Sequence, residues 1–565
     1  MTETITGAEL VTQALIQRKT QWIFSLSGGH ITPIYQFLEG SSVKIFDTRH
    51  EQSALFMAEA YGKLTGRPGV AMVTAGPGFT NALTGVASAC FSNTPLVLIA
   101  GSVGLDNKEK LDLQDMPQEE VIKPMVKKTL VCRKAERVNE YIDMAFRIAL
   151  SGRPGPVYLE FPIDVLNTPV PRDGVKYICS DIASNPADPA GAEKLLDMMQ
   201  AAERPVIIAG TGARQSGAEN ELKDFIENTG APLFTSLSGR GTVSDNHPLC
   251  FEGAVAVRPG CGFTAYVESD LIIILGSRIC LYYLFGDIFN PEARIVQVDI
   301  EPEEIGRNRS VDLPIVSDVK AFLNLCNNLI DKKDIACALK EKYAPWIEKL
   351  LKAHKVGKDA SESDWNSNNT PIHPLRLAGD VNEFMNKDTD IVVADGGDTT
   401  TWMGMTRTIK KPGTYLDYGI FGSLAVGIPY ANTAKLLNPD SRVCLVTGDG
   451  SVGFNFMEFE TAIRKDLPIV VVISNDLGWG MIRHSQELRI GHAIEDGTFL
   501  GKVDYHKMVE AIGGKGFLVN TPEDIKPALK QAFASKKVCC INVMTDPSTV
   551  SPASTMLANI GAYKA

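Results

Sequence analysis

Short apolar runs alternate with helix-like segments along the first 170 residues of the chain. A helix is predicted at residues 52–64, and Gly66 is placed to end it because glycine readily adopts the left-handed backbone of a helix C-terminus. Strands are predicted at residues 22–26, 43–47, 70–74, 96–100 and 157–161. This alternation predicts a doubly wound α/β domain with a parallel sheet.

The same alternation recurs twice further along the chain. The second block has predicted strands at residues 205–209, 232–236, 271–275 and 295–299, and the third at residues 391–394, 443–446 and 469–473. Polar segments at residues 168–188 and 359–370 are interpreted as linkers. A chain of 565 residues is also too long for one hydrophobic core. The sequence therefore predicts three doubly wound parallel-sheet domains, at residues 1–170, 189–345 and 371–547, followed by a tail at residues 548–565.

The composition is that of a soluble globular protein, with 44% apolar residues and a net charge of −11. It offers no basic face for nucleic acid and no polybasic patch for a membrane surface. The amino terminus has no basic-then-apolar leader, and no apolar run approaches the roughly 18 residues of a membrane span. Eleven cysteines without CxxC pairs indicate reduced thiols. We therefore expect a cytoplasmic protein that binds neither nucleic acid nor membrane.

Candidate chemistry concentrates at residues 443–480, which predict a strand, a glycine turn, a helix at about 455–465, a second strand and an acidic loop. The turn is Gly448-Asp449-Gly450-Ser451, whose glycines let backbone amides approach an anion. Asp476 follows the second strand, 476 − 449 = 27 positions later. Both acids are expected at the carboxyl edge of one parallel sheet, where α/β proteins bind their ligands. Two carboxylates there suit Mg²⁺, which usually bridges to phosphates, so a phosphate-bearing cofactor is expected.

This unit resembles the signature of thiamine-diphosphate enzymes, a GDG triplet followed some two dozen residues later by a pair of asparagines. Here 24 residues, 451–474, lie between the two parts, and Asp476 stands in place of the second asparagine. The resemblance implies that the cofactors are thiamine diphosphate and Mg²⁺. The metal would be held by Asp449, Asp476 and the carbonyl of Gly478, and the cofactor would contact Gly448, Gly450 and Ser451.

The amino-terminal domain carries further matches. They are Gly28-Gly29-His30-Ile31, residues 45–51 ending in Arg49-His50-Glu51, residues 73–82 and Leu113-Gln114. With the GDG unit they resemble the group of acetohydroxyacid synthase, benzaldehyde lyase and 2-hydroxyacyl-CoA lyase, and the local likeness is closest to benzaldehyde lyase. This implies that Glu51 activates the pyrimidine ring of the cofactor, that His30 and Gln114 lie near the substrate carbonyl, and that Thr74 and Asn81 contact the cofactor. His50 is interpreted as structural, and His484 as a pocket candidate.

Two loops of the third domain have cofactor roles by the same resemblance. Thr399 and Thr400 would hydrogen-bond phosphate oxygens, the carbonyl of Gly422 would accept from the aminopyrimidine, and Leu424 would wedge between the two rings of the cofactor. Asp398 stands where acetohydroxyacid synthases have glutamine. Because a carboxylate facing a diphosphate is repelled, the alternative role for Asp398 is to cap a helix.

The middle domain and the substrate leave alternatives open. Gly210-Thr211-Gly212 and Asp299 allow a bound FAD or ADP, but the GxGxxG fingerprint is incomplete, which favours a structural role. Met481 stands where benzaldehyde lyase has alanine, which indicates a narrower acceptor pocket. The segment typical of acetohydroxyacid synthase is absent at residues 251–255, and a tail nearly without basic residues argues against acyl-CoA substrates.

The resemblance as a whole implies a carboligase or lyase that makes or cleaves the C–C bond of 2-hydroxyketones through an enamine intermediate, as benzaldehyde lyase does. The alternative is an acetolactate-synthase-like enzyme that decarboxylates and ligates 2-oxo acids. A 2-hydroxyacyl-CoA lyase, a flavin-linked oxidase and a non-catalytic regulator are less favoured. The expected partners are a small aldehyde, 2-hydroxyketone or 2-oxo acid and further copies of the chain, in a homodimer or homotetramer with active sites between subunits.

Overall fold

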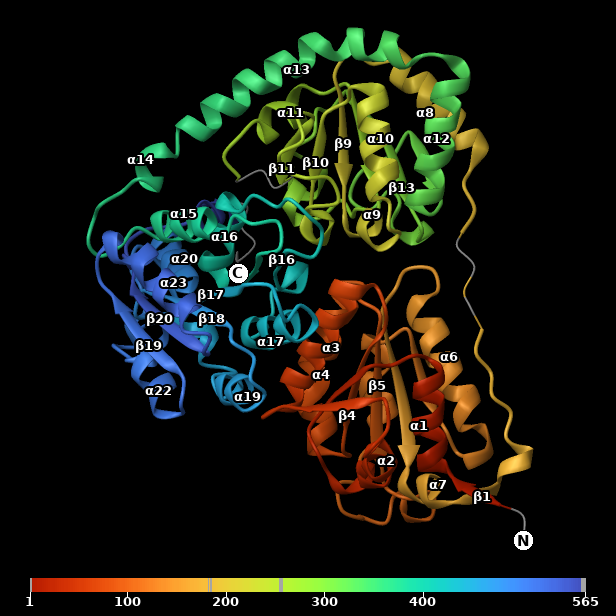
Figure 1. Ribbon diagram of the computed structural model, residues 1–565. Helices are drawn as coiled ribbons and strands as arrows, with labels where there is room; N and C mark the ends of the chain where they lie inside the picture. Colours follow the sequence, from red (N-terminus) through yellow and green to blue (C-terminus); the bar gives the residue numbers. More distant parts are fainter. Residues whose placement is uncertain (1–2, 181, 183–184, 254–257, 560–565) are drawn as a thin grey trace. The chain divides into compact units, whose positions relative to one another are not determined.

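The computed structural model describes residues 3–180, 182, 185–253 and 258–559 (Figure 1). The chain divides into two compact units. The first unit comprises Met1–Ala183, Tyr418–Asp440 and Gly453–Ile469. The second unit comprises Ser184–Asp417, Ser441–Val452 and Val470–Ala565.

The first unit contains a six-stranded parallel sheet with the order β3-β2-β4-β5-β7-β6. Its strands are β2 (Trp22–Ser25), β3 (Lys44–Asp47), β4 (Gly69–Val73), β5 (Leu96–Ser102), β6 (Lys128–Val131) and β7 (Pro156–Pro162). Its helices include α1 (Gly7–Gln17), α2 (Thr32–Leu38), α3 (Glu51–Thr65), α4 (Pro77–Phe91), α5 (Gln118–Ile122), α6 (Val138–Leu150), α17 (Gly427–Leu437) and α19 (Glu458–Arg464). Helices α1 and α6 share one core with the sheet, and Gly66 ends α3 with a φ of +68°.

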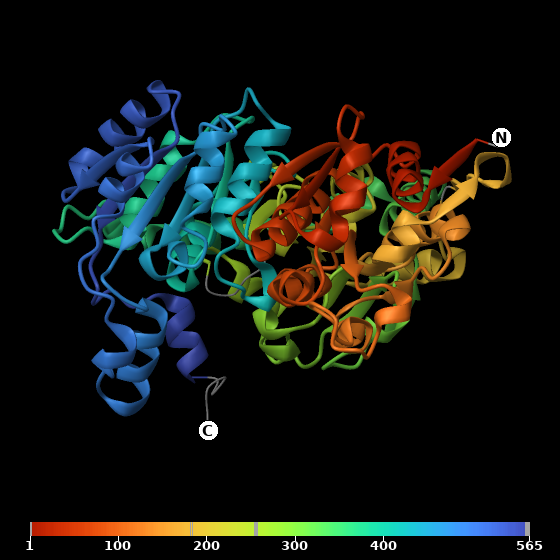
Figure 2. The ribbon, with the colours of Figure 1, turned by 90° about the horizontal axis from the view of Figure 1, so that it is seen from below.

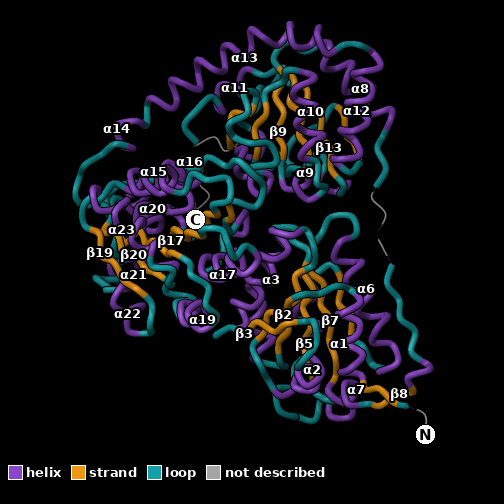
Figure 3. The backbone as a smooth tube through the Cα atoms, viewed as in Figure 1, coloured by secondary structure: helices purple, strands orange, loops and turns teal. Residues whose placement is uncertain are grey.

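The second unit contains two more six-stranded parallel sheets, and helices enclose the strands of each (Figure 3). The sheet of the middle domain has the order β11-β10-β9-β12-β13-β14. Its strands are β9 (Pro205–Ala209), β10 (Leu233–Thr235), β11 (Cys250–Gly253), β12 (Leu271–Leu275), β13 (Arg294–Asp299) and β14 (Leu313–Val316). Helices α8 (Pro189–Ala201), α10 (Glu219–Thr229) and α12 (Val319–Lys333) cover one face together with the first turns of α13 (Ala336–Asp359), which add Leu339 and Tyr343. Helix α11 (Gly262–Glu268) and the later turns of α13, with Trp346 and Leu350, cover the other face (Figure 1).

The other sheet of the second unit has the order β16-β15-β17-β18-β20-β19. Its strands are β15 (Ile391–Ala394), β16 (Tyr415–Leu416), β17 (Val443–Gly448), β18 (Val470–Asn475), β19 (Lys515–Val519) and β20 (Cys539–Met544). Its helices include α15 (Pro374–Phe384), α16 (Gly397–Thr406), α18 (Asp449–Val452), α20 (Gly480–Ile490), α21 (Glu495–Thr498), α22 (Tyr505–Ala511), α23 (Ile525–Ala534) and α24 (Pro552–Asn559). The three sheets confirm the predicted α/β fold class, whereas the exact domain boundaries stay a prediction.

Several predicted elements differ from the structure. The helix expected at 455–465 is shorter, because α19 begins at Glu458, and the turn at Asp449 continues into the short helix α18. The segment interpreted as a second linker, 359–370, contains the one-turn helix α14 (Glu362–Trp365). In the first linker, β8 (Pro169–Pro171) pairs with β1 (Thr4–Thr6). The tail is helical at α24, and its residues 560–565 lie outside the described part of the chain. Among the described residues, no helix is both long and apolar enough to cross a membrane.

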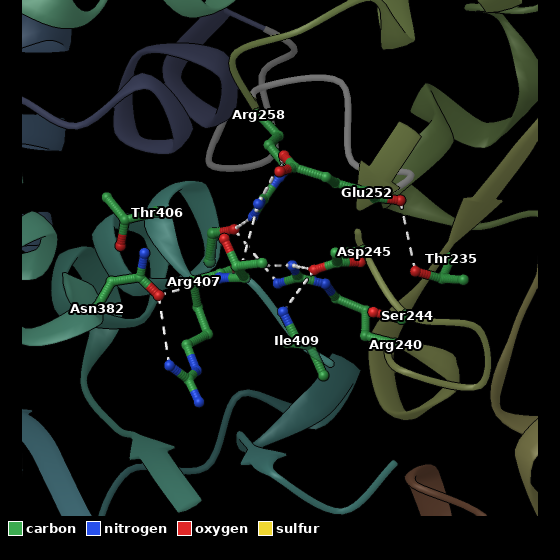
Figure 4. Close-up of polar contacts among 12 residues, drawn as sticks. Thr235, Arg240, Ser244, Asp245, Glu252, Arg258, Asn382, Thr406, Arg407 and Ile409 are labelled. Atoms are coloured by element: carbon green, nitrogen blue, oxygen red, sulfur yellow. Dashed lines mark hydrogen bonds and ion pairs between the residues drawn. The ribbon is translucent and has the colours of Figure 1, made fainter. Parts of the chain in front are cut away.

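Two arginines of the middle domain hold the carboxyl end of α16 (Figure 4). Arg240 and Arg258 both donate to the carbonyl of Arg407, the residue that follows α16, at 2.8 and 3.0 Å. Each arginine is paired with an acid, Arg240 with Asp245 at 3.1 Å and Arg258 with Glu252 at 2.8 Å. Cations suit this position because a helix exposes unpaired carbonyls at its carboxyl end. These contacts from the middle domain therefore stabilise the carboxyl end of α16, the helix that begins at Gly397.

Candidate cofactor and active site

Asp449 and Asp476 follow neighbouring parallel strands, as predicted from the sequence. β17 and β18 pair in register from Cys444 with Val470 to Gly448 with Ser474. The Asp449 side chain is buried, and its Oδ2 has no hydrogen-bond partner. Burial first, and then the neighbouring Asp476 carboxyl, raise the pKa of Asp449 to about 8. Asp449 and Asp476 are thus two crowded carboxyl groups, a pair of oxygen ligands that suits a cation.

Gly480 and Gly396 let the backbone come close to its neighbours at the sheet edge that carries Asp449 and Asp476. A Cβ at Gly480 would lie 2.2 Å from Asp476 Oδ2, and one at Gly396, which has a φ of +91°, would lie 3.1 Å from the Gly448 nitrogen. Thr400 Oγ1 is buried there without a hydrogen-bond partner. Within the described residues no group of three or more His, Cys, Asp or Glu side chains could hold a metal. Two carboxylates therefore suit a hard cation only if main-chain or phosphate oxygens complete its shell.

Asp398 does not cap a helix with its side chain, so that alternative was wrong. The residue lies in the first turn of α16, whose N-cap is Gly396. Its Oδ1 accepts from Ser551 Oγ at 2.5 Å and Ser554 Oγ at 2.8 Å, and its Oδ2 contacts His484 Nδ1 at 3.0 Å. Ser551 and Ser554 are more than 150 positions away in sequence, and no local pattern marked them.

His484 connects the same carboxylate to the tail. Its Nε2 lies 2.9 Å from the carbonyl oxygen of Pro547, so both ring nitrogens face acceptors. Burial alone would lower the pKa of His484, but the hydrogen bonds to Asp398 and Pro547 outweigh burial and raise it. Helix α24 lies beside the α20–α21 segment in this unit (Figure 2). His484, predicted as a pocket candidate, therefore joins α16, α20 and the tail.

In the first unit, Glu51 begins α3 and is 6% exposed. Its Oε2 accepts from Asn81 Nδ2 at 3.0 Å. A Cβ at Gly78 would lie 3.3 Å from Glu51 Oε1 and 2.7 Å from Thr74 Cγ2, so this glycine lets the carboxylate and the start of α4 approach each other. The structure thus brings together Glu51, Thr74 and Asn81, as the sequence motifs predicted.

His30 and Gln114 lie at the same sheet edge, after β2 and β5. His30 Nδ1 is 3.3 Å from Thr74 Oγ1. Partial burial lowers the pKa of His30, although Asp112 and Gln114 act in the opposite direction. Gln114 has a φ of +68° and packs against Gly76, where a Cβ would lie 2.8 Å from Gln114 Cβ. His50 instead caps α3, because its Nδ1 accepts from the Gln52 amide, which agrees with a structural role.

All three sheet domains match described domains of one family. Residues 5–124 match the N-terminal TPP binding domain of thiamine pyrophosphate enzymes, residues 192–325 the central domain, and residues 395–543 the C-terminal TPP binding domain. Thiamine pyrophosphate (TPP) is another name for thiamine diphosphate. The chain is 31% identical over 559 residues to the acetolactate synthase large subunit IlvG of Mycobacterium tuberculosis, with 98% of each chain covered. The chain belongs to the thiamine pyrophosphate enzyme family.

Other relatives in this family are named 2-hydroxyacyl-CoA lyases. The chain is 32% identical over 565 residues to the 2-hydroxyacyl-CoA lyase of Arabidopsis thaliana, with 96% of each chain covered. It is 29% identical over 570 residues to the human 2-hydroxyacyl-CoA lyase 1, with 98% of this chain and 96% of the relative covered. This thiamine pyrophosphate enzyme therefore uses thiamine diphosphate to make or break carbon–carbon bonds.

In the middle domain of this thiamine pyrophosphate enzyme, the loop Gly210-Thr211-Gly212 packs against Gly276, which follows β12. A Cβ at Gly210 would lie 2.6 Å from the Gly276 oxygen, and one at Gly212 would lie 2.7 Å from the Gly276 Cα. The amide of Gly212 donates to the Gly276 carbonyl at 2.9 Å, and Asp299 Oδ1 accepts from the Glu301 amide. The two glycines are therefore used for packing between two strand ends, and the structural interpretation of this loop stays a prediction.

The segment with Gly422 and Leu424 belongs to the first unit, whereas Asp398, Thr399, Asp449 and Asp476 belong to the second. Phe421 stacks on Phe91, the last residue of α4, with ring centroids 5.1 Å apart. Gly422 has a φ of +69°, which suits a glycine. Of the segment compared with acetohydroxyacid synthase at 251–255, residues 254 and 255 lie outside the described residues.

Proposed function

We propose that this enzyme makes or cleaves the bond between the carbonyl and carbinol carbons of 2-hydroxyketones, as benzaldehyde lyase does. The observation that carries the proposal is the placement of His30, whose ring contacts Thr74 at the sheet edge that also holds Glu51 and Asn81. An imidazole beside the activating carboxylate can exchange a proton with a substrate hydroxyl, which C–C cleavage of a hydroxyketone requires. Gln114 would help to hold the substrate oxygen.

The acidic edge of the second unit suits the diphosphate of the cofactor together with Mg²⁺. The unpartnered Oδ2 of Asp449 and Oγ1 of Thr400 are oxygens that a cation and a phosphate would satisfy. Asp449, Asp476 and the Gly478 carbonyl would hold the metal, and Thr399, Gly448, Gly450 and Ser451 would lie against the diphosphate. Thiamine diphosphate, when bound, supplies a carbon nucleophile that also accepts electrons.

Glu51 would act on the pyrimidine ring of the cofactor. Its carboxylate is buried and is held by the Asn81 amide, so one oxygen stays available at the Gly78 face. A buried carboxylate that is already oriented loses little further entropy on binding a ring nitrogen. The Gly422 carbonyl would accept from the amine of this pyrimidine, and Leu424 would wedge between the two rings of the cofactor.

The placement of these groups along α4 supports an assembly of at least two copies. Asn81, which holds Glu51, and Phe91, on which Phe421 stacks, are ten positions apart on α4. This separation corresponds to about 15 Å along a helix. One cofactor that touches both Glu51 and Leu424 is therefore more easily held by two chains than by one. We propose a homodimer or homotetramer with active sites between subunits.

Acetolactate synthesis from a 2-oxo acid is the second candidate, favoured by the names of the relatives in Mycobacterium tuberculosis and Methanococcus aeolicus. Purified enzyme supplied with thiamine diphosphate and Mg²⁺ is given benzoin, acetoin, pyruvate or a 2-hydroxyacyl-CoA in parallel, and products are identified by mass spectrometry. Aldehyde release from benzoin or acetoin that is strongly reduced, but still measurable, in His30→Ala supports the proposal. CO₂ and acetolactate from pyruvate favour the second candidate, and cleavage of the CoA ester favours the lyases of Arabidopsis and human.

A further inference from the structure

Gln118 is a buried amide beneath the candidate active site of the first unit, and no motif of the sequence marked it. It begins the short helix α5 and is 2% exposed. Its Oε1 accepts from the Gly76 amide at 2.9 Å, and its Nε2 donates to the Gly101 carbonyl at 3.1 Å and to the Tyr158 hydroxyl at 2.9 Å. Because a main-chain N–H only donates and a carbonyl only accepts, this pattern leaves one orientation for the amide.

The two glycines held by Gln118 form the surfaces on which the two substrate-facing candidates pack. A Cβ at Gly76 would lie 2.8 Å from Gln114 Cβ and 3.0 Å from the Gln114 carbonyl oxygen. A Cβ at Gly101 would lie 2.6 Å from His30 Cβ and 2.8 Å from the His30 carbonyl oxygen. The Gln118 side chain thus contacts two backbone segments. The Gly76 segment packs against Gln114, and the Gly101 segment packs against His30.

A buried network holds Gln118 itself in place. Tyr158 accepts from Gln118 and donates to Glu160 Oε2 at 2.7 Å, and Gln118 Nε2 is 3.4 Å from the same oxygen. Tyr158 and Glu160 are both at most 1% exposed. In such a dry setting an unpaired amide or carbonyl is costly, so the network has one well-defined arrangement.

We propose that Gln118 is a positioning residue that sets the relative placement of His30 and Gln114 by joining Gly76 to Gly101. The inference rests on the proposed function only in assigning His30 and Gln114 to the substrate. The amide acts through the backbone and touches neither substrate nor cofactor. Its loss would let the Gly76 and Gly101 segments separate, which displaces the two side chains but leaves Glu51 with Asn81.

The test compares Gln118→Met, which keeps the length and removes both hydrogen-bonding groups, with Gln118→Glu, which keeps the acceptor for Gly76 but loses the donor to Gly101. Asn139→Leu is the matched control, because Asn139 is also a 2% exposed amide of this unit and donates instead to the Lys176 carbonyl. Displacements of about 1 Å can cost about 100-fold in rate. We expect both Gln118 variants to lower kcat by about 10- to 100-fold, with thiamine diphosphate affinity, measured by fluorescence quenching, within threefold of the parent.

Two further measurements make the outcome decisive. In a His30→Ala/Gln114→Ala background, Gln118→Met should have almost no additional effect on kcat, whereas full additivity overturns the proposal. Crystal structures of Gln118→Met and Asn139→Leu should show displaced His30 and Gln114 side chains only in the former, and unmoved side chains overturn the proposal without any assay of turnover. A parent enzyme inactive on every hydroxyketone refutes the proposed function instead, so the two failures are distinguishable.

Discussion

We predict that the Asp398 carboxylate holds helix α24 against the first turn of α16. Its carboxylate accepts from Ser551 and Ser554 of the tail and contacts His484 of α20. The carboxylate is mostly shielded, with its side chain 15% exposed, so water replaces these contacts poorly. The perturbation is Asp398→Leu, which has a similar length and removes every acceptor. Asp398→Asn, which keeps one acceptor oxygen, is the intermediate variant.

The size of the effect follows from the three contacts. A hydrogen bond to a charged group contributes about 1.5–3 kcal/mol, but three that share one carboxylate are not additive. Asp398→Leu is therefore expected to lower the free energy of local opening of α24 by about 3 kcal/mol. At about 1.4 kcal/mol for each factor of ten, this corresponds to about 100-fold faster exchange of the α24 amides. Asp398→Asn should increase the exchange rate of the α24 amides about 10-fold.

Hydrogen–deuterium exchange with mass spectrometry reads residues 552–559 directly and does not require the whole chain to unfold in two states. Asp504→Asn is the control, because the Asp504 carboxylate pairs with Lys507 at the surface, 2.6 Å away. Exchange of α24 should be unchanged in the control. If Asp398→Leu leaves the α24 amides within about threefold of the parent, the carboxylate does not hold the tail and the reasoning fails.

Two other predictions concern Glu51 and Glu252. Glu51→Gln keeps an acceptor for Asn81 and should retain the circular dichroism and melting temperature of the parent, yet abolish turnover; activity within a few-fold of the parent would contradict the role of Glu51. Burial alone would raise the pKa of Glu252, but Arg258 and Lys358 outweigh burial and lower it from 4.5 to about 2. Because the folded pKa is depressed, this acid stabilises the fold above pH 4.5 and loses that contribution as the pH falls toward 2. Calorimetry should show Glu252→Gln losing about 3 kcal/mol at pH 7, with the gap to the parent narrowing below pH 4.5; equal stability at pH 7 would refute this assignment.

The strands in the centre of each sheet were predictable because local sequence is sufficient for them. Residues 205–209, 271–275 and 391–394 are continuous apolar runs, and the observed β9, β12 and β15 have those bounds. A parallel strand buried on both faces must be apolar throughout, so its composition reveals it. Among the strands missed, β6, β11, β14, β16 and β19 are edge strands of the three sheets, whereas the edge strand β3 was predicted. Buried and exposed positions alternate in β14, and only Val519 is buried in β19. These short segments are strands because a neighbouring strand pairs with them.

The sequence by itself determined the three-domain α/β organisation, the family, and the sheet edges to which Asp449, Asp476, Glu51 and His30 belong, because motifs at strand ends are local in the chain. Tertiary structure alone decided which distant groups meet at those edges. Asp398 meets Ser551 and Ser554, and Gln118 joins Gly76 to Gly101. Such contacts join residues between 17 and 156 positions apart and leave no periodicity in the sequence. They form because a buried carboxylate or amide must find partners wherever the fold places donors and acceptors.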